Sequence, residues 1–271
     1  MDSEKEFLSE YNIEDFDRPS VTSDIVILTM RSQKECSYRH DPNNRLSILL
    51  IKRGQHPYKD CWALPGGFIS RGETIEECAL REVKEETNIL PSALLPTGVY
   101  SEDNRDPRGW IISNAFTSVI SSENINPKGG DDASDARWFD LSFEANDSGE
   151  YMLLLTNSDI KLVAVLKETK RSFGTTSFEI VENSSLAFDH AKIIASSLST
   201  LRSRADNPQI LFDFLPEKFT FAELQRVYET ITNETVLTAN FRRKMSVYVE
   251  PTEETTTGAG HRPAQLFRQR K

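Results

Sequence analysis

A stretch of 23 residues, from Gly67 to Ile89, limits what this chain can fold into more than any other part of it. Its apolar residues recur every four positions, which predicts a helix from Thr74 to about Thr87 with one face in a core. Those apolar residues are Ile75, Ala79 and Val83. The opposite face carries acidic residues at offsets of three and four, namely Glu82, Glu85 and Glu86. Because like charges on one turn repel each other, the helix predicts a cation among them.

The oxygen ligands on this helix indicate which cation would bind. Carboxylates suit Mg²⁺ or Mn²⁺, which keep some of their waters and also bind the phosphates of a substrate. An acidic helix face is usually only solvated surface, so the flanking residues decide between the two interpretations. Glu73 lies in the expected first turn, where the helix dipole favours an anion, and Arg81 can brace a carboxylate. A glycine turn, Gly66-Gly67-Phe68, precedes the helix. These flanks favour a metal site.

The order of these residues resembles the Nudix box. The motif positions are held by Gly67, Glu73, Arg81, Glu82, Glu85, Glu86 and Ile89, and Asn88 stands where glycine is usual. Asparagine is the next best residue after glycine for a left-handed backbone, so this departure is mild. Nudix hydrolases cleave a diphosphate joined to another group and use divalent cations. The resemblance implies that Glu82, Glu85 and Glu86 bind Mg²⁺ (or Mn²⁺), and that Arg81 orients these carboxylates.

The general base is left open at this stage. One candidate is Glu86, and the other is an acid of the loop from 124 to 136, of which Asp132 is named. A glycine pair, Gly129-Gly130, allows this loop to move, so its carboxylates can approach the metal or take a proton from water. Solvated loop acids are nevertheless commoner than catalytic ones.

A second group of residues points to the substrate. Arg105 and Arg108 flank a Pro-Gly turn close to the expected diphosphate site, where guanidinium groups can hold phosphate or ribose oxygens. This segment resembles one found in Nudix proteins that handle ADP-ribose. Taken alone, it is equally well an exposed loop. Arg53, at the end of a strand-like run, and the turn residues Gly67 and Phe68 complete the expected substrate contacts.

Composition sets the limits of the whole chain. At 271 residues it is long enough for two ordinary domains, and no apolar run approaches the length of a membrane span. Three cysteines without metal-type spacing fit a reducing compartment, so we expect a cytoplasmic protein. The net charge of −10 argues against a nucleic-acid binder, but from residue 208 onward nine basic residues balance eight acidic ones. Basic clusters in this tail matter more than the total.

Strand-like runs on both sides of the acidic helix predict a mixed sheet with helices on its faces. The fold class is therefore α+β, and the resemblance implies a Nudix α/β/α sandwich. We expect an N-terminal segment over 1–20 and the Nudix domain over 21–185. Residues 141–185 would be an insertion of short strands that decorates the sheet, without chemistry of its own. A linker helix over 186–207 would lead to a final domain over 208–271.

The final domain carries two helix signals around a polar turn. Thr220 and Glu223 form a capping box, and a second helix is expected over 238–245. This is the helix-turn-helix arrangement, followed by two strand-like runs that make a wing. The candidate DNA contacts are Asn240, Arg242, Arg243, Lys244 and, in the wing, Arg262. By spacing alone, such residues are more often solvated surface, and the module could also serve only to pair two chains.

Four segments extend the resemblance to the second half of the chain: LAFDH from 186, FTFAELQRVYE from 219, NFRRKM from 240 and GHRPAQLF from 260. In this order they look like the Nudix-related (NrtR-type) regulators of bacterial NAD metabolism. The resemblance implies that the Nudix domain binds ADP-ribose and that a winged helix binds operator DNA as a homodimer. The leading hypothesis is a Mg²⁺-dependent hydrolase of ADP-ribose or a related nucleoside diphosphate sugar that also regulates transcription. One alternative is a repressor that senses ADP-ribose without cleaving it; another is a housekeeping pyrophosphatase whose tail only dimerises.

Overall fold

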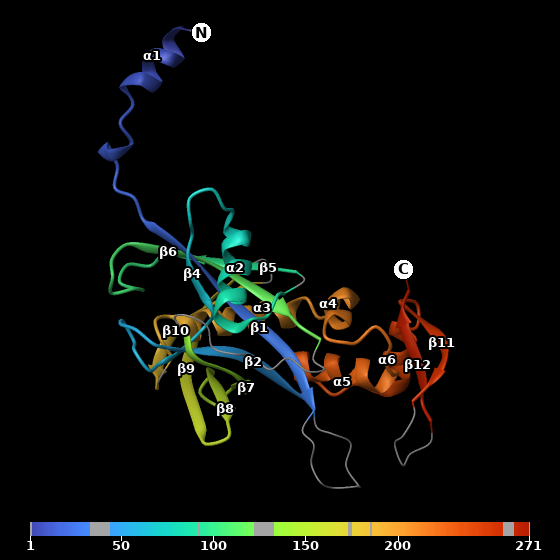
Figure 1. Ribbon diagram of the computed structural model, residues 1–271. Helices are drawn as coiled ribbons and strands as arrows, with labels where there is room; N and C mark the ends of the chain where they lie inside the picture. Colours follow the sequence, from blue (N-terminus) through green and yellow to red (C-terminus); the bar gives the residue numbers. More distant parts are fainter. Residues whose placement is uncertain are drawn as a thin grey trace.

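A computed structural model describes residues 2–32, 44–91, 93–121, 133–172, 175–184, 186–256 and 263–270. Figure 1 shows an N-terminal arm, a large sheet flanked by helices, and a small helical domain that ends in a hairpin. In chain order the elements are α1 (Asp2–Glu10), η1 (Ile13–Asp15), β1 (Ser20–Ser32), β2 (Asn44–Arg53), β3 (Trp62–Ala63), β4 (Gly66–Phe68), α2 (Ile75–Thr87), β5 (Leu95–Tyr100), β6 (Ile111–Val119), β7 (Ala133–Ala145), β8 (Glu150–Asn157), β9 (Ile160–Ser172), β10 (Thr175–Asn183), α3 (His190–Ser203), α4 (Pro208–Asp213), α5 (Phe221–Thr232), α6 (Thr238–Met245), β11 (Val249–Thr255) and β12 (Gln265–Gln269).

The large sheet is mixed, as the sequence predicts. Its main strands lie in the order β10-β9-β8-β7-β2-β1-β6-β5, with the short strands β3 and β4 paired to β2 and β1. The pair β1 and β6 is parallel, and the other pairs in this sheet are antiparallel. The run Ile25-Val26-Ile27-Leu28 of β1 is fully buried, as expected for a strand covered on both faces.

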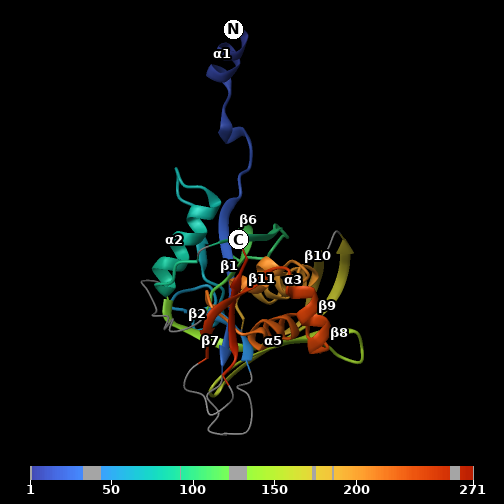
Figure 2. The same cartoon turned by 90° about the vertical axis from the view of Figure 1, so that its right-hand side faces the viewer.

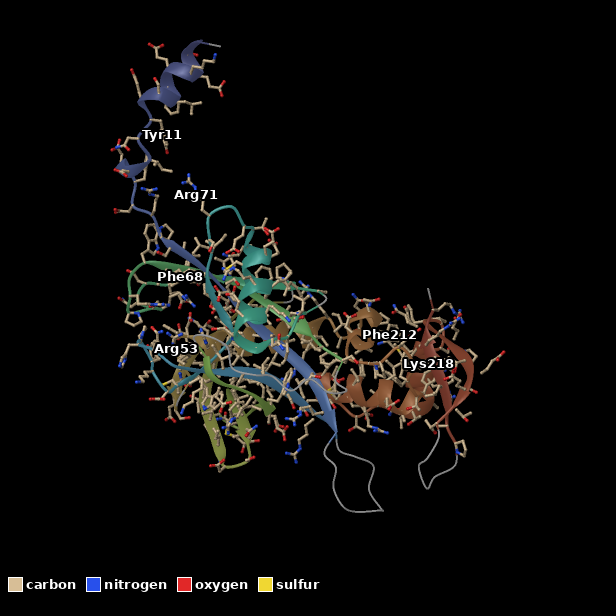
Figure 3. All side chains as sticks on the ribbon, viewed as in Figure 1. Tyr11, Arg53, Phe68, Arg71, Phe212 and Lys218 are labelled. Atoms are coloured by element: carbon tan, nitrogen blue, oxygen red, sulfur yellow. The ribbon has the colours of Figure 1, made fainter. Side chains whose placement is uncertain are left out.

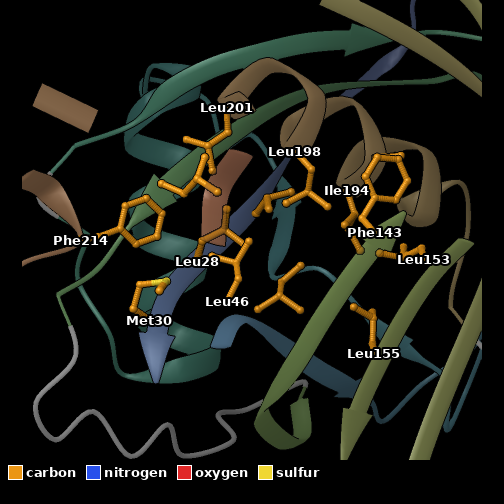
Figure 4. Close-up of a cluster of buried hydrophobic side chains, with 14 of the residues drawn as sticks. Leu28, Met30, Leu46, Phe143, Leu153, Leu155, Ile194, Leu198, Leu201 and Phe214 are labelled. Carbon is orange, nitrogen blue, oxygen red and sulfur yellow. The ribbon is translucent and has the colours of Figure 1, made fainter. Parts of the chain in front are cut away.

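The two faces of β1 pack against different helices. Ile25 and Ile27 belong to a cluster with Ala79 and Val83 of α2, whereas the alternating residues Val26, Leu28 and Met30 belong to the larger cluster that contains α3. Figure 4 shows Leu28, Met30 and Leu46 of the sheet gathered near Leu198 and Leu201 of α3, with Phe214 beside them. The fold is thus an α/β/α sandwich, and the predicted fold class is confirmed.

Residues 141–185 are where the fold differs from the expected decoration. The three predicted strands are present as β8, β9 and β10, and they continue the same antiparallel sheet from β7. Phe143, Leu153, Leu155 and Phe178 share the main core with α3. Apolar residues alternate along these strands and give the segment one apolar face. That face is buried against α3, so the segment is an integral part of the sheet.

The final domain is a winged helix, as predicted, and it is joined to the sheet by a continuous core. The capping box at Thr220 and Glu223 begins α5, and β11 and β12 form the wing hairpin. Phe214 and Phe219 of this domain belong to the same apolar cluster as Leu28 of the sheet.

The N-terminal arm projects away from the body in two perpendicular views (Figures 1 and 2). No helix in the described ranges is long and apolar enough to cross a membrane.

Candidate functional site

Helix α2 is capped at both ends. Thr74 and Glu77 form a capping box, and Asn88 takes the left-handed conformation with φ 59° while its N–H donates to the Lys84 carbonyl. Asparagine thus performs the role that glycine usually performs after a helix. Glu73 lies one residue before the cap rather than in the first turn, and it accepts a hydrogen bond from the Ser70 N–H at 2.6 Å.

Arg81 is the hub of the carboxylates on this helix. Its Nε and Nη2 donate to Glu73 at 3.0 and 2.7 Å, and its Nη1 donates to Glu82 at 2.8 Å and to Glu85 at 3.2 Å. The bonds from Arg81 and from the Ser70 N–H lower the pKa of Glu73 to about 2. The expectation that Arg81 braces carboxylates therefore has a geometric basis, and the same guanidinium also donates to the Phe68 carbonyl.

Glu86 differs from its neighbours because it is buried. Its side chain accepts one hydrogen bond from the Gly66 N–H at 2.9 Å, and only 8% of the residue is exposed. Burial raises the pKa of Glu86 to about 8, and the nearby Glu82 and Asp24 act in the same direction. Burial also raises the pKa of Glu82. Glu85, in contrast, has a side chain that is 57% exposed.

The glycine turn is required by space. A Cβ on Gly67 would lie 2.3 Å from the carboxyl carbon of Glu82, and a Cβ on Gly66 would lie 2.1 Å from the Ser23 carbonyl oxygen. Gly66 also has φ 153°, in a region that favours glycine. The turn can therefore approach the acidic helix only because Gly67 lacks a side chain, and it can approach β1 only because Gly66 lacks one.

Across the described ranges, no three His, Cys, Asp or Glu side chains converge closely enough to hold a metal ion as they stand. The physical reason is visible in the hydrogen bonds: Glu82 and Glu85 point to Arg81, and Glu86 points to the Gly66 N–H. The donor set nevertheless suits a hard divalent cation, since it offers carboxylate oxygens of which one is buried and incompletely neutralised.

A cavity of about 350 Å³ opens between α2 and the far wall of the sheet. Its lining includes Glu82, Glu86 and Arg81 of the acidic helix. It also includes basic, aromatic and acidic residues from the sheet and from the loops beside it: Arg53, Phe68, Arg105, Asp106, Arg108, Phe188, His190 and Asp24. Figure 3 labels Phe68 and Arg53 on this flank of the sheet. The predicted substrate residues Arg53, Gly67, Phe68, Arg105 and Arg108 therefore share one pocket with the acidic helix.

Two arginines lie on the aromatic rings of this pocket. The Arg108 guanidinium is 4.9 Å from the Phe68 ring centre and 5.5 Å from the Phe188 ring centre, and it pairs with Asp106 at 2.7 Å. The Arg53 guanidinium is 4.8 Å from Phe188 and donates to the Pro57 carbonyl. Burial and the positive charge of Arg108 lower the pKa of Arg53. The crowded cations make this wall attractive to an anion.

Arg105 is more deeply placed than an exposed loop would allow. Its Nε and Nη2 donate to Asp189 at 3.0 and 2.7 Å, and Asp24 lies 3.6 Å away. Its side chain is only 4% exposed. Arg105 therefore lines the pocket floor as half of a buried ion pair, so its bonding capacity is largely used by the protein itself.

Sequence reasoning missed the acid and the aromatic residue that complete this floor. Asp24 accepts a hydrogen bond from the Ser113 hydroxyl, and Phe188 and Asp189 come from the segment expected only to link domains. His190 lies beside them: its Nδ1 accepts from the Leu64 N–H at 2.9 Å, and its Nε2 lies 3.5 Å from Asp24. Burial lowers the pKa of His190. The sequence Phe-Asp-His directly before an apolar helix is the signal that could have marked these residues.

The four predicted DNA contacts on α6, Asn240, Arg242, Arg243 and Lys244, are all exposed. Arg242 also lies 4.8 Å from the Phe221 ring, and Lys244 pairs with Asp206 at 2.5 Å on the surface. Arg243 Nη2 donates to Asn240 Oδ1 at 3.5 Å. Arg262 of the wing and Asp132 of the mobile-loop hypothesis lie outside the described residues.

Two family models match the chain. One is the NUDIX domain, over residues 36–149, and the other is the NrtR DNA-binding winged helix domain, over residues 211–269. The chain is a Nudix domain joined to an NrtR winged helix domain. The family resemblance inferred from the acidic helix and from the tail is thereby confirmed. This Nudix–winged helix chain is also similar to several known proteins over different lengths.

The similarity to one curated protein spans nearly the whole Nudix–winged helix chain. The chain is 27% identical over 270 residues to the ADPR responsive transcriptional repressor NtrR of Acinetobacter baylyi. This match covers 98% of the chain and 88% of the Acinetobacter protein. The chain is 53% identical over 96 residues to the ADP-ribose pyrophosphatase of Methanocaldococcus jannaschii; the match covers 35% of this chain and only 55% of that enzyme. Among solved structures, a MutT/nudix family protein from Enterococcus faecalis has a TM-score of 0.74 and 26% identity and covers 100% of this chain and 93% of its own.

Proposed function

We propose that the Nudix domain of this chain hydrolyses ADP-ribose, or a related nucleoside diphosphate sugar, and that its winged helix makes it an ADP-ribose-responsive regulator of transcription. One observation carries the proposal: a single pocket has carboxylates braced by Arg81 on one wall and arginines stacked on aromatic rings on the other. A diphosphate between two organic groups matches this distribution of charge and apolar surface.

Mg²⁺ (or Mn²⁺) is the cofactor that we propose, with Glu82, Glu85 and Glu86 as its ligands. When bound, such a cation neutralises the diphosphate and lowers the pKa of a water that attacks phosphorus. Arg81 fixes the orientation of Glu82 and Glu85 by direct hydrogen bonds. The products from ADP-ribose would be AMP and ribose 5-phosphate.

Several residues of the chain act on the substrate itself in this proposal. Arg53 and Arg108 bind the phosphates, since both line the cavity and the positive charge of Arg108 disfavours that of Arg53. Phe68 and Phe188 offer flat rings for the nucleoside. Glu86, or an acid of the 124–136 loop such as Asp132, accepts the proton of the attacking water.

The DNA-binding role is supported by the matched winged helix domain and by the named function of the Acinetobacter relative. Asn240, Arg243 and Lys244 are exposed on α6 and are the contacts that we propose for operator DNA, together with Arg262 in the wing, while Arg242 beside them lies over the Phe221 ring. A homodimer in the cytoplasm is the expected working form, because winged helix proteins commonly read two half-sites.

A second function is favoured by the way the carboxylates are bonded. Arg81 already neutralises much of the acidic face, and no three acids in the described ranges converge on one point. The same pocket could therefore bind ADP-ribose without cleaving it and act as a sensor only.

One assay separates the two functions. Purified protein is incubated with ADP-ribose and Mg²⁺, and AMP is quantified by chromatography beside a Glu85→Gln control. Hydrolysis requires AMP well above that control, whereas a sensor binds ADP-ribose by calorimetry without forming AMP. A gel shift at two salt concentrations tests DNA binding, which weakens as salt rises if phosphate contacts carry it. Retention of no duplex at low salt would leave only a pyrophosphatase with a dimerising tail.

A further inference from the structure

The first turn of α3 belongs to the ligand pocket. Phe188 takes a left-handed conformation with φ 52°, which directs the chain so that its ring meets Tyr58 at 4.7 Å and the Arg53 guanidinium at 4.8 Å. A residue other than glycine holds this conformation only where its surroundings enforce it. Asp189 then receives two hydrogen bonds from Arg105, and His190 holds the Leu64 N–H in the turn before Gly66.

The other end of α3 belongs to the winged helix. Arg202 donates from Nε to the Ile231 carbonyl of α5 at 3.1 Å and from Nη2 to the Phe143 carbonyl of β7 at 2.8 Å. Its guanidinium also lies 5.3 Å from the Phe143 ring. Just beyond the helix, Asp206 pairs with Lys244 of the exposed helix α6.

Between these ends α3 is packed as a rigid element. It has 14 residues, so at 1.5 Å per residue it spans roughly 20 Å. Its buried residues include Ile193, Ile194, Leu198 and Leu201, which share one core with the sheet and with the winged helix. A helix packed at this density moves as a unit, because its side chains cannot rearrange one by one.

We propose that α3 is the element through which occupancy of the pocket changes DNA binding, with Asp189 and Arg202 as the positioning residues at its two ends. This inference rests on the proposed function. Phosphates that pair with Arg53 and Arg108 draw these two guanidinium groups away from the Phe188 ring. The contacts at the start of α3 change as a result. The displacement of that turn reaches α5 and α6 through Arg202 and Asp206. An equilibrium is shifted only by contacts that differ between its two states, and in this proposal the Phe188 and Asp189 contacts are the ones that differ.

The test measures the coupling between two ligands. The probe is α,β-methylene ADP-ribose with Mg²⁺, since its bridging carbon prevents cleavage, and the DNA is a labelled duplex selected from random sequence by the wild-type protein. The DNA Kd is measured by anisotropy without and with saturating probe for wild type, Asp189→Asn and Arg202→Gln. Glu102→Gln is the matched control, because the Glu102 side chain pairs with Lys192 of α3 and is itself 67% exposed.

In wild type and in Glu102→Gln we expect the probe to change the DNA Kd by at least about fivefold, the lower end of usual allosteric coupling. In Asp189→Asn and Arg202→Gln this ratio should fall to within about twofold of unity while the variants still bind the probe and the DNA. Such a loss at saturating probe is not produced by a merely weaker pocket.

Two results would overturn the inference. Full coupling in Asp189→Asn or in Arg202→Gln shows that α3 is not the route, although the proposed function survives. No coupling in wild type removes the regulator proposal and the inference together. Where a variant does not fold, hydrogen exchange on the wild type decides: protection of residues 188–206 must change with the probe, and an unchanged segment beside a changed DNA Kd refutes the route.

Discussion

Replacing Gly67 by alanine tests whether the position of Glu82 matters, because the new Cβ would lie 2.3 Å from the Glu82 carboxyl carbon and 2.3 Å from its Oε1. Gly67 does not need a left-handed backbone, so the effect comes from space alone. The atoms in the way are the far end of a flexible side chain, and Glu82 can rotate aside. It then loses its 2.8 Å bond to Arg81. For a partly exposed pair we expect a loss of about 1–2 kcal/mol in the free energy of unfolding.

The effect of Gly67→Ala on hydrolysis should be much larger than its effect on stability. Displacing a catalytic group by about 1 Å costs on the order of 100-fold in rate, so we expect at least that loss in AMP formation from ADP-ribose. Unfolding in urea and AMP release are measured on the same preparation. Gly98→Ala is the control, since a Cβ there only meets the Tyr100 ring at 3.5 Å. Hydrolysis by Gly67→Ala within threefold of wild type, or an equal loss in Gly98→Ala, would refute the reasoning.

Three further predictions use other parts of the chain. Burial lowers the pKa of His190, so its contribution to stability is full above the unfolded pKa of about 6.5 and is lost as the pH falls below that value. Between pH 7.5 and 5.5, the free energy of unfolding in urea should therefore fall less in His190→Gln than in wild type. Burial raises the pKa of Cys78 to about 11, so iodoacetamide at pH 8 should modify it at least about 100-fold more slowly than Cys61, as peptide mapping would show. Arg243→Ala should reduce the salt slope of DNA binding by about 1, whereas Arg242→Ala should leave the slope and lower the melting temperature, because Arg242 packs on the Phe221 and Phe267 rings. Equal slopes for Arg243→Ala and wild type would contradict that assignment.

The sequence predicts the acidic helix well because its signals are local. An apolar repeat of four and a left-handed end are both read within a few turns, and Asn88 takes the expected left-handed conformation just after the helix. The winged helix is predictable for the same reason, since the capping box at Thr220 begins α5. Which strands pair is less local, yet the continuous apolar run Ile25-Val26-Ile27-Leu28 of β1 is enough to indicate a strand covered on both faces.

The pocket floor could not be predicted in the same way because its partners are far apart in sequence. Asp189 meets Arg105 across 84 residues, and His190 meets Leu64 across 126 residues. No periodic pattern links such distant pairs. The partners of a Phe-Asp-His sequence before a helix are set by the folded sheet, so they cannot be predicted from the local sequence. The same limit applies to Arg242, whose spacing suits a DNA groove but whose guanidinium has two aromatic rings at hand.

The charge argument that predicts a cation changes once the hydrogen bonds are known. Repulsion among the helix carboxylates is offset in large part by Arg81, which contacts Glu82 and Glu85 directly. Glu86 does not share this partner: it is buried, receives one N–H from Gly66, and has its pKa raised to about 8. The electrostatic demand for a cation is therefore concentrated at Glu86 instead of being spread over the cluster. Because Glu86 lines the same pocket as Arg53 and Arg108, a divalent cation beside Glu86 would favour its ionised form, and a diphosphate would pair with the two arginines.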